Sequence, residues 1–148
     1  FSVSHDAADP IGINVFAGND KATVVTDTGV ISDDILRRID DTTLLVLEAN
    51  YDPHMLRFGP YQPFLKQRVA SDEGHLSNEM AAQALLMMKR PNFMQVILAH
   101  RSENNNNAVL VTQTIGKMLV DGGVRIGPEM KLQHGQPNEI VSIQSVER

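Results

Sequence analysis

Cysteine is absent from all 148 residues, which excludes disulfide bonds and thiolate metal ligands. Any bound metal would therefore be held by histidine and carboxylate side chains. Tryptophan is also absent and aromatic residues make up only 5%, so aliphatic side chains and seven methionines must fill the interior. No apolar run approaches the roughly 20 residues that a membrane-spanning helix needs. The formal net charge of −5 excludes general affinity for nucleic acid, which would need a local basic patch.

The composition is that of a single globular domain. The hydrophobic fraction of 42% and the charged fraction of 21% are ordinary for such a chain, and its length can bury a core. The chain opens at Phe1 without an initiator methionine or a signal-peptide pattern, as if it entered the fold within a strand. We therefore expect a fragment of a longer protein, and a cytoplasmic one because no export or membrane signal is visible.

Alternating apolar and β-branched segments predict strands that are interleaved with amphipathic helices. The expected strands are 1–4, 12–16, 22–26, 44–47 and 95–99, with a hairpin turn at 18–20. The expected helices are 33–39, capped by Ser32, one that begins at Ser77 or Asn78 and ends before Pro91, and 108–119. Residues 50–74 are predicted to be a loop, the asparagine run 104–107 a simple turn, and the tail from Gly122 turns and short exposed strands. This order predicts an α/β fold built from βαβ units.

Ionisable side chains follow four of these strands. They are His5, Asp27, Glu48 and His100, and His75 lies just before the next helix. Open α/β sheets bind ligands beyond the carboxyl ends of their strands, so the five side chains are expected to converge. Each has an ordinary structural explanation when taken alone, but a carboxylate that ends a buried strand needs a partner. Together they predict a histidine–aspartate site for zinc, manganese or iron, although three ligands are too few for two metals.

Several stretches of the chain resemble, in the same order, the metallo-β-lactamase-fold hydrolases of the YycJ/WalJ type. They are Ser4 to Ala7, Val25 to Gly29, Leu47 to Asn50, Gly74 to Asn78 and Leu98 to Ser102. The most specific part is Asp52 to Asn78, with Met55-Leu56, Gly59-Pro60-Tyr61 and Leu65-Lys66-Gln67-Arg68. The resemblance extends from His5 to about Asn106.

The resemblance implies an α/β metallo-β-lactamase fold, a four-layer αββα sandwich. Residues 1–148 would form the C-terminal half of one such domain, because the His-x-His-x-Asp-His metal motif of the N-terminal half is absent. The chain alone is then expected to be inactive, since half of the metal ligands are missing. It would also expose one side of a paired sheet, so the isolated chain should associate into homo-oligomers or aggregates.

The resemblance also assigns roles to individual residues around two divalent metal ions, zinc or manganese. His5 would bind one metal, His100 the second, and Asp27 would bridge both. His75 matches a histidine that acts as general acid near the scissile phosphate in related tRNA 3′-processing endonucleases, and Glu48 would orient it. Tyr51 departs from the family pattern, because relatives usually carry a histidine there.

The implied function is a two-metal phosphodiester hydrolase acting on nucleic acid, with DNA favoured over RNA and a 5′ exonuclease-like activity. Its partners would be the nucleic acid and the N-terminal half of the same protein. Arg57, Lys66 and Arg68 either contact phosphates or belong to a solvated loop. Two alternatives stay open. One is a hydrolase of cyclic phosphodiesters or other small esters on the same fold. The other is a non-catalytic regulatory protein, which the replacement of the usual histidine by Tyr51 favours.

Overall fold

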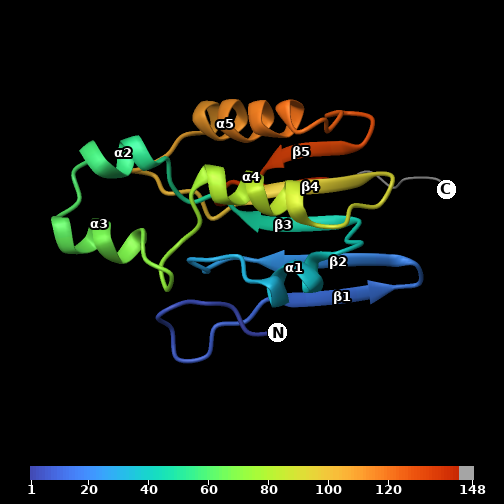
Figure 1. Cartoon of the computed structure of the whole chain (residues 1–148), viewed down its shortest axis with the longest axis horizontal. Helices are drawn as coiled ribbons and strands as arrows, with labels where there is room; N and C mark the ends of the chain where they lie inside the picture. Colours follow the sequence, from blue (N-terminus) through green and yellow to red (C-terminus); the bar gives the residue numbers. More distant parts are fainter. Residues whose placement is uncertain (144–148) are drawn as a thin grey trace.

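Five strands form one sheet in which their order in space follows their order in the chain (Figure 1). This computed structural model describes residues 1–143. The strands are β1 (Ile13–Ala17), β2 (Asp20–Val25), β3 (Leu44–Glu48), β4 (Met94–Ala99) and β5 (Met130–His134). β1 and β2 form an antiparallel hairpin whose turn contains Gly18 at φ 59°, a conformation that glycine adopts without strain. β2 to β5 are parallel.

Three helices cover one face of this sheet. They are α1 (Asp33–Ile39), α4 (Asn78–Met87) and α5 (Ala108–Asp121). Because each parallel strand is added next to the previous one, right-handed crossovers place the connecting helices on the same side. The core consists of their inward side chains, such as Ile39, Leu85 and Ile115, packed on strand residues that alternate toward them, such as Leu45 and Val96.

Polar side chains fix where the helices begin. The Ser32 hydroxyl accepts a hydrogen bond from the backbone N–H of Ile35, and Ser77 and Asn107 cap α4 and α5 in the same way. The bounds predicted for 33–39 are confirmed, and of the two caps that the sequence left open for the next helix, Ser77 and Asn78, the structure has Ser77. The predicted strands within β1 to β4 are confirmed as well.

Residues 50–74, predicted to be a loop, instead contain two short helices, α2 (Pro53–Phe58) and α3 (Pro63–Val69). The prediction was wrong because prolines were taken as loop signals. Here both prolines occupy the first helical turn, where a missing N–H costs nothing. α2 also has a side-chain cap, since the Asp52 carboxylate accepts from the Met55 N–H at 2.8 Å. Figure 1 shows both helices beyond the end of the sheet toward which β3 and β4 point.

Three other expectations need correction. Residues 1–4 form no strand and make only an isolated bridge between Ser2 and Ile11. The asparagine run is more than a simple turn, because Asn105 and Asn106 are buried and Asn107 caps α5. In the tail, the described part contains β5, whose Met130 is fully buried in the sheet, whereas residues 144–148 lie outside the described part.

The face of the sheet opposite α1, α4 and α5 is apolar. Ile13, Val15 and Val24 are exposed there, and Leu44 and Val46 of the neighbouring strand are half-buried. None of the described helices covers this face. Apolar side chains on both faces are typical of a sheet that is buried on both sides. Among the described residues, no helix is both long and apolar enough to cross a membrane.

Candidate metal centre

The parallel strands bring their last residues to one edge of the sheet. Glu48 is the final residue of β3 and pairs with Ala99 of β4, so His100 follows at the same level. Asp27 comes two residues after the end of β2, which runs beside β3. The predicted convergence at the carboxyl ends is therefore present.

Two loops carry the remaining histidines to the same edge. Asp6 N–H donates to the Glu73 carbonyl at 3.1 Å, which joins the segment containing His5 to the one that precedes His75. The Asn50 N–H donates to the Leu76 carbonyl at 3.0 Å and holds the start of α4 against the end of β3. The ring centroids of His5 and His75 are 5.0 Å apart, and those of His75 and His100 are 5.2 Å apart.

Glu48 is a fully buried carboxylate that four donors satisfy. Its Oε1 lies 2.7 Å from the Nδ1 atoms of both His75 and His100. Its Oε2 accepts from the backbone N–H of Thr28 at 3.1 Å and of Leu76 at 3.4 Å. Burial alone would raise the pKa of the Glu48 carboxyl, but the hydrogen bonds from His100 and His75 outweigh burial and lower it. Glu48 is therefore an anion, which can only accept hydrogen bonds.

This arrangement fixes the tautomers of three imidazoles. Since the Glu48 carboxylate can only accept, the Nδ1 atoms of His75 and His100 both carry a hydrogen. His5 is set in the same way, because its Nδ1 lies 3.0 Å from the Gly74 carbonyl oxygen. In their neutral forms, all three rings keep the lone pair on Nε2. That is the orientation of a metal-binding histidine whose other nitrogen donates to the protein.

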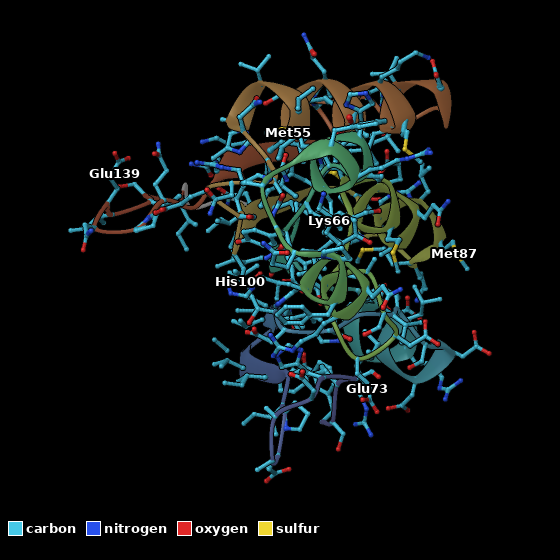
Figure 2. The ribbon with its side chains drawn as sticks, turned by 90° about the vertical axis from the view of Figure 1, so that its left-hand side faces the viewer. Met55, Lys66, Glu73, Met87, His100 and Glu139 are labelled. Atoms are coloured by element: carbon cyan, nitrogen blue, oxygen red, sulfur yellow. The ribbon has the colours of Figure 1, made fainter. Side chains whose placement is uncertain are left out.

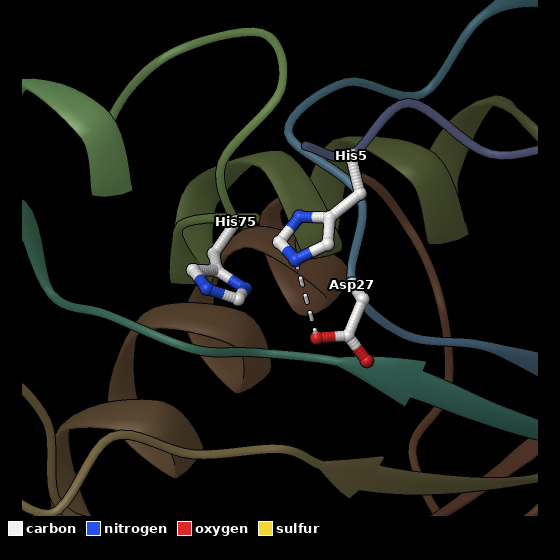
Figure 3. Close-up of side chains that lie close together, drawn as sticks. All are labelled: His5, Asp27 and His75. Atoms are coloured by element: carbon white, nitrogen blue, oxygen red, sulfur yellow. Dashed lines mark ion pairs between the residues drawn. The ribbon is translucent and has the colours of Figure 1, made fainter. Parts of the chain in front are cut away.

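Asp27 supplies a half-buried carboxylate to the cluster. Its Oδ1 lies 3.8 Å from Nε2 of His5, the contact drawn in Figure 3, and 3.6 Å from Nδ1 of His100. Two groups of histidine and carboxylate side chains have ligand atoms within 4.8 Å of one another. His5, Asp27 and His75 could hold an ion, whereas Glu48, His75 and His100 are already joined by the Nδ1 hydrogen bonds. Ligand atoms around one zinc ion, bound at about 2.0–2.2 Å, lie roughly 3–4 Å apart. Imidazole nitrogens with carboxylate oxygens at such spacing fit a divalent ion such as zinc or manganese.

The backbone is strained at two of these residues. Asp27 has a φ of 55° and His100 a φ of 51°, in the left-handed region that non-glycine residues rarely adopt. Asp27 follows the end of β2 and His100 the end of β4, the two strands on either side of β3, and there the chain turns sharply and aims each side chain into the cluster. Strain of this kind is concentrated at functional sites.

The hydrogen bond to Glu48 also raises the pKa of His100, although burial opposes it.

The predicted phosphate-contacting bases lie on α2 and α3, in front of the strand ends, as Figure 2 shows for α3 at Lys66. Arg68 donates from Nη2 to Asp6 Oδ1 at 2.9 Å, and a second bond from its Nε makes the pair bidentate. This pairing lowers the pKa of Asp6. Lys66 Nζ donates to the Arg57 carbonyl at 2.8 Å. The structure thus places these bases beside the cluster, while their role toward phosphates stays a prediction.

Sequence reasoning missed a buried asparagine network that supports the cluster. The side chains of Asn78 and Asn106 exchange two hydrogen bonds of 3.1 and 2.8 Å, and Asn106 also donates to the Ala49 carbonyl at 3.0 Å. Asn50 donates to the His100 carbonyl at 2.8 Å. The network ties the end of β3, the loop after His100 and the start of α4. The only signal in the sequence was the asparagine run itself.

Tyr51 occupies the position where a histidine was expected from the resemblance. Its side chain is buried with Leu56 and Val69 in a small apolar cluster beneath α2 and α3. Burial raises the pKa of Tyr51, and the carboxylates of Glu79 and Glu48 add to this. Tyr51 therefore holds the α2–α3 segment in place.

Comparison with known proteins agrees with this geometry. The chain is 35% identical over 146 residues to exodeoxyribonuclease YycJ of Bacillus anthracis, a match that covers 99% of this chain and 55% of the relative. It is 33% identical over 138 residues to exodeoxyribonuclease WalJ of Streptococcus pneumoniae serotype 2, covering 93% of this chain and 51% of the relative. The crystal structure of the metallo-β-lactamase fold protein YhfI from Bacillus subtilis superposes with a TM-score of 0.61 at 12% identity, covering 92% of this chain and 45% of that structure.

The chain corresponds to part of a YycJ-type protein with the metallo-β-lactamase fold. It spans about half the length of the curated relatives it matches. No family model matches the chain. The fold predicted from the sequence is therefore confirmed, and the YycJ-type resemblance with it.

Proposed function

We propose that this chain forms the C-terminal half of a two-metal phosphodiester hydrolase of the metallo-β-lactamase fold that acts on nucleic acid. The observation that carries the proposal is the convergence of His5, His75 and His100 beside Asp27, with each Nδ1 donating to a fixed acceptor. Three oriented imidazoles and a carboxylate are a metal-binding arrangement with no evident structural purpose. The remaining ligands would come from an N-terminal half of the same protein.

In this proposal His5, Asp27 and His100 would be the ligands that this chain supplies to two divalent ions. The donor set of imidazole nitrogens and a carboxylate fits zinc or manganese. When bound, such ions supply a nucleophile from water at neutral pH and neutralise the charge that develops on phosphate oxygens. Ionised Glu48 keeps the His100 ring in the tautomer that leaves Nε2 free.

His75 is proposed as the group that gives a proton to the leaving oxygen. Glu48 accepts from Nδ1 of His75 at 2.7 Å, so the ring is held and its Nε2 is the atom that can carry the transferred proton. Glu48 therefore serves His75 and His100 together.

The names of the relatives support DNA as the substrate, since those proteins are called exodeoxyribonucleases. Attack from the 5′ end and a cytoplasmic location are parts of the same proposal. So is contact between substrate phosphates and Arg57, Lys66 and Arg68, which lie on the helices beside the cluster.

The test uses the intact protein and an Asp27→Ala variant, with metal content and DNA cleavage measured together. We expect about two metals per wild-type chain, and a fall in both metal content and cleavage in the variant. Asp9→Ala, which changes an exposed aspartate in the loop after His5, is the matched control and should behave as wild type. Bound metal with hydrolysis of a small phosphodiester but not of DNA or RNA would refute the nucleic-acid assignment. Absence of metal would refute the hydrolase itself.

A further inference from the structure

The outer surfaces of α2 and α3 carry two phenylalanines that the fold leaves in solvent. Phe58 is 67% exposed and Phe64 is 70% exposed, in a chain with only five phenylalanines. The inward side chains of these helices, such as Leu56 and Val69, already form their own buried cluster. Phe58 contacts the ring of His54, with the ring centroids 4.6 Å apart, but neither phenylalanine belongs to a buried cluster.

Basic side chains accompany both rings. The guanidinium of Arg57 lies 5.3 Å from the centre of the Phe58 ring. Lys66 joins the two helices by donating to the Arg57 carbonyl. Between residues 53 and 70 there is no aspartate or glutamate, although the whole chain has a net charge of −5. This is the local basic patch that an acidic protein would need to bind nucleic acid.

The patch leads to the histidine cluster. Phe64 and Arg68 lie one helical turn apart on α3, so their side chains share a face. Arg68 forms its bidentate pair with Asp6, the residue after His5. Phe58, Arg57, Lys66, Phe64 and Arg68 all lie on α2 and α3, and we call these five residues the α2–α3 strip; its end at Arg68 reaches the edge of the cluster. Figure 2 views the molecule from the end where α2 and α3 lie.

We propose that the α2–α3 strip binds single-stranded nucleic acid, with bases stacked on Phe64 and Phe58 and phosphates near Arg57 and Lys66. The inference rests on the proposed function, and it specifies the strand state of the substrate. An aromatic ring in solvent presents a face to an unpaired base, whereas the bases of a duplex have their faces covered. Aromatic rings near cationic side chains can contact both the bases and the phosphates of a flexible single strand.

The test is binding of a fluorescent thymidine oligonucleotide to the intact protein, measured by anisotropy with a chelator present to prevent cleavage. Phe64→Ala should weaken binding roughly 5- to 150-fold, the range for loss of one stacked base. It should leave the salt dependence unchanged, because no phosphate contact is lost. Phe64→Trp should retain the affinity. Lys66→Ala should instead reduce the slope of binding against salt.

Phe16→Ala is the matched control. Phe16 is also 70% exposed and also lies near a cation, since Lys21 Nζ is 5.9 Å from its ring centre, but it belongs to the β1–β2 hairpin. Its removal should not change binding. An oligonucleotide with abasic positions should bind wild type as weakly as the full oligonucleotide binds Phe64→Ala.

Two failures are distinguishable. If wild type binds the oligonucleotide and both Phe64→Ala and Phe58→Ala bind it equally well, the strip is refuted and the proposed hydrolase stands. If Phe64→Ala lowers the melting temperature while binding is unchanged, the ring packs against the rest of the protein and the strip is likewise refuted. If the wild-type protein neither binds nor cleaves single-stranded or duplex nucleic acid, the proposed function itself is refuted.

Discussion

The two ends of the parallel strands differ in what their side chains do. At the carboxyl ends, a fully buried glutamate holds two histidines. At the amino ends, a cavity of about 720 Å³ lies beside Val15, Leu44 and Ile143, and the nearby Lys21 donates to the Arg38 and Asp40 carbonyls. This cavity thus lies at the opposite end of the strands from the histidine cluster. The orientation of its donor atoms, and not the volume of a cavity, marks the candidate metal site.

The difference has a physical origin in the topology. Parallel strands point their C-terminal ends the same way, so residues that follow β2, β3 and β4 must meet. The amino ends of β3, β4 and β5 follow helices, and that of β2 follows the hairpin turn, so the residues there only have to end the preceding element. Polar groups there satisfy backbone carbonyls, as Lys21 does, and none is buried as an anion among the described residues.

The largest effect on this difference between the two ends is expected from removal of Glu48. Glu48→Ala would leave two imidazole N–H groups and two backbone N–H groups without their acceptor inside the protein. We expect the free energy of unfolding to fall by about 3–5 kcal/mol. We also expect metal affinity to fall roughly 10- to 100-fold, as it does when a group that hydrogen-bonds a metal ligand is removed. Urea unfolding and metal titration of the intact protein measure the two effects.

The control for Glu48 lies at the opposite end of the sheet. Lys21→Met removes two hydrogen bonds to backbone carbonyls of the α1 terminus but touches no part of the histidine cluster. It should lower stability slightly and leave metal affinity unchanged. Equal effects of both variants on metal affinity would contradict the division between the two ends.

A smaller effect is expected at the asparagine network. Asn106→Ala removes the partner of Asn78 and a donor to the Ala49 carbonyl in a buried setting, which should cost about 1–3 kcal/mol. Asn104→Ala is a control from the same run of asparagines, because Asn104 is exposed and makes one long contact to the Tyr61 hydroxyl. Thermal unfolding of both variants compares them, and equal melting temperatures would show that the network does not stabilise the strand ends.

Much of this fold could be predicted from local patterns. The strands around Val46 and Ile97 and the Ser32 and Ser77 caps follow from alternation and capping, which act within a few residues. The convergence of Asp27, Glu48 and His100 followed from sheet topology, whereas His5 and His75 reach the same edge on loops. The shared contact of Glu48 with His75 and His100 could not be predicted, because a residue's second partner depends on side-chain positions in three dimensions.

The failures came from residues whose effect depends on position. Pro53 and Pro63 favour a helix in its first turn and break it elsewhere, so their presence alone does not separate a loop from a helix start. Asn106 looks like any turn residue until its side chain is found buried against Asn78. In both cases tertiary packing decided among local options that the sequence left open.

The smallest expected effect concerns His134, at the carboxyl end of β5 and outside the cluster. Burial lowers the pKa of His134, and the charge of Arg101 lowers it further. Its Nε2 lies 2.9 Å from the Thr112 hydroxyl oxygen, which itself donates to the Ala108 carbonyl, so the neutral ring donates to Thr112. The folded state therefore prefers neutral His134.

The sign of the pH effect follows from that preference. Because the folded pKa lies below the unfolded value of about 6.5, the stabilisation is complete above pH 6.5 and is lost as the pH falls through the folded pKa. One proton limits the slope to about 1.4 kcal/mol per pH unit. In His134→Gln this acid dependence should be reduced while metal affinity stays unchanged. A variant that unfolds with the pH dependence of wild type would show that His134 titrates alike in both states, and a loss of metal affinity would extend the functional edge to β5.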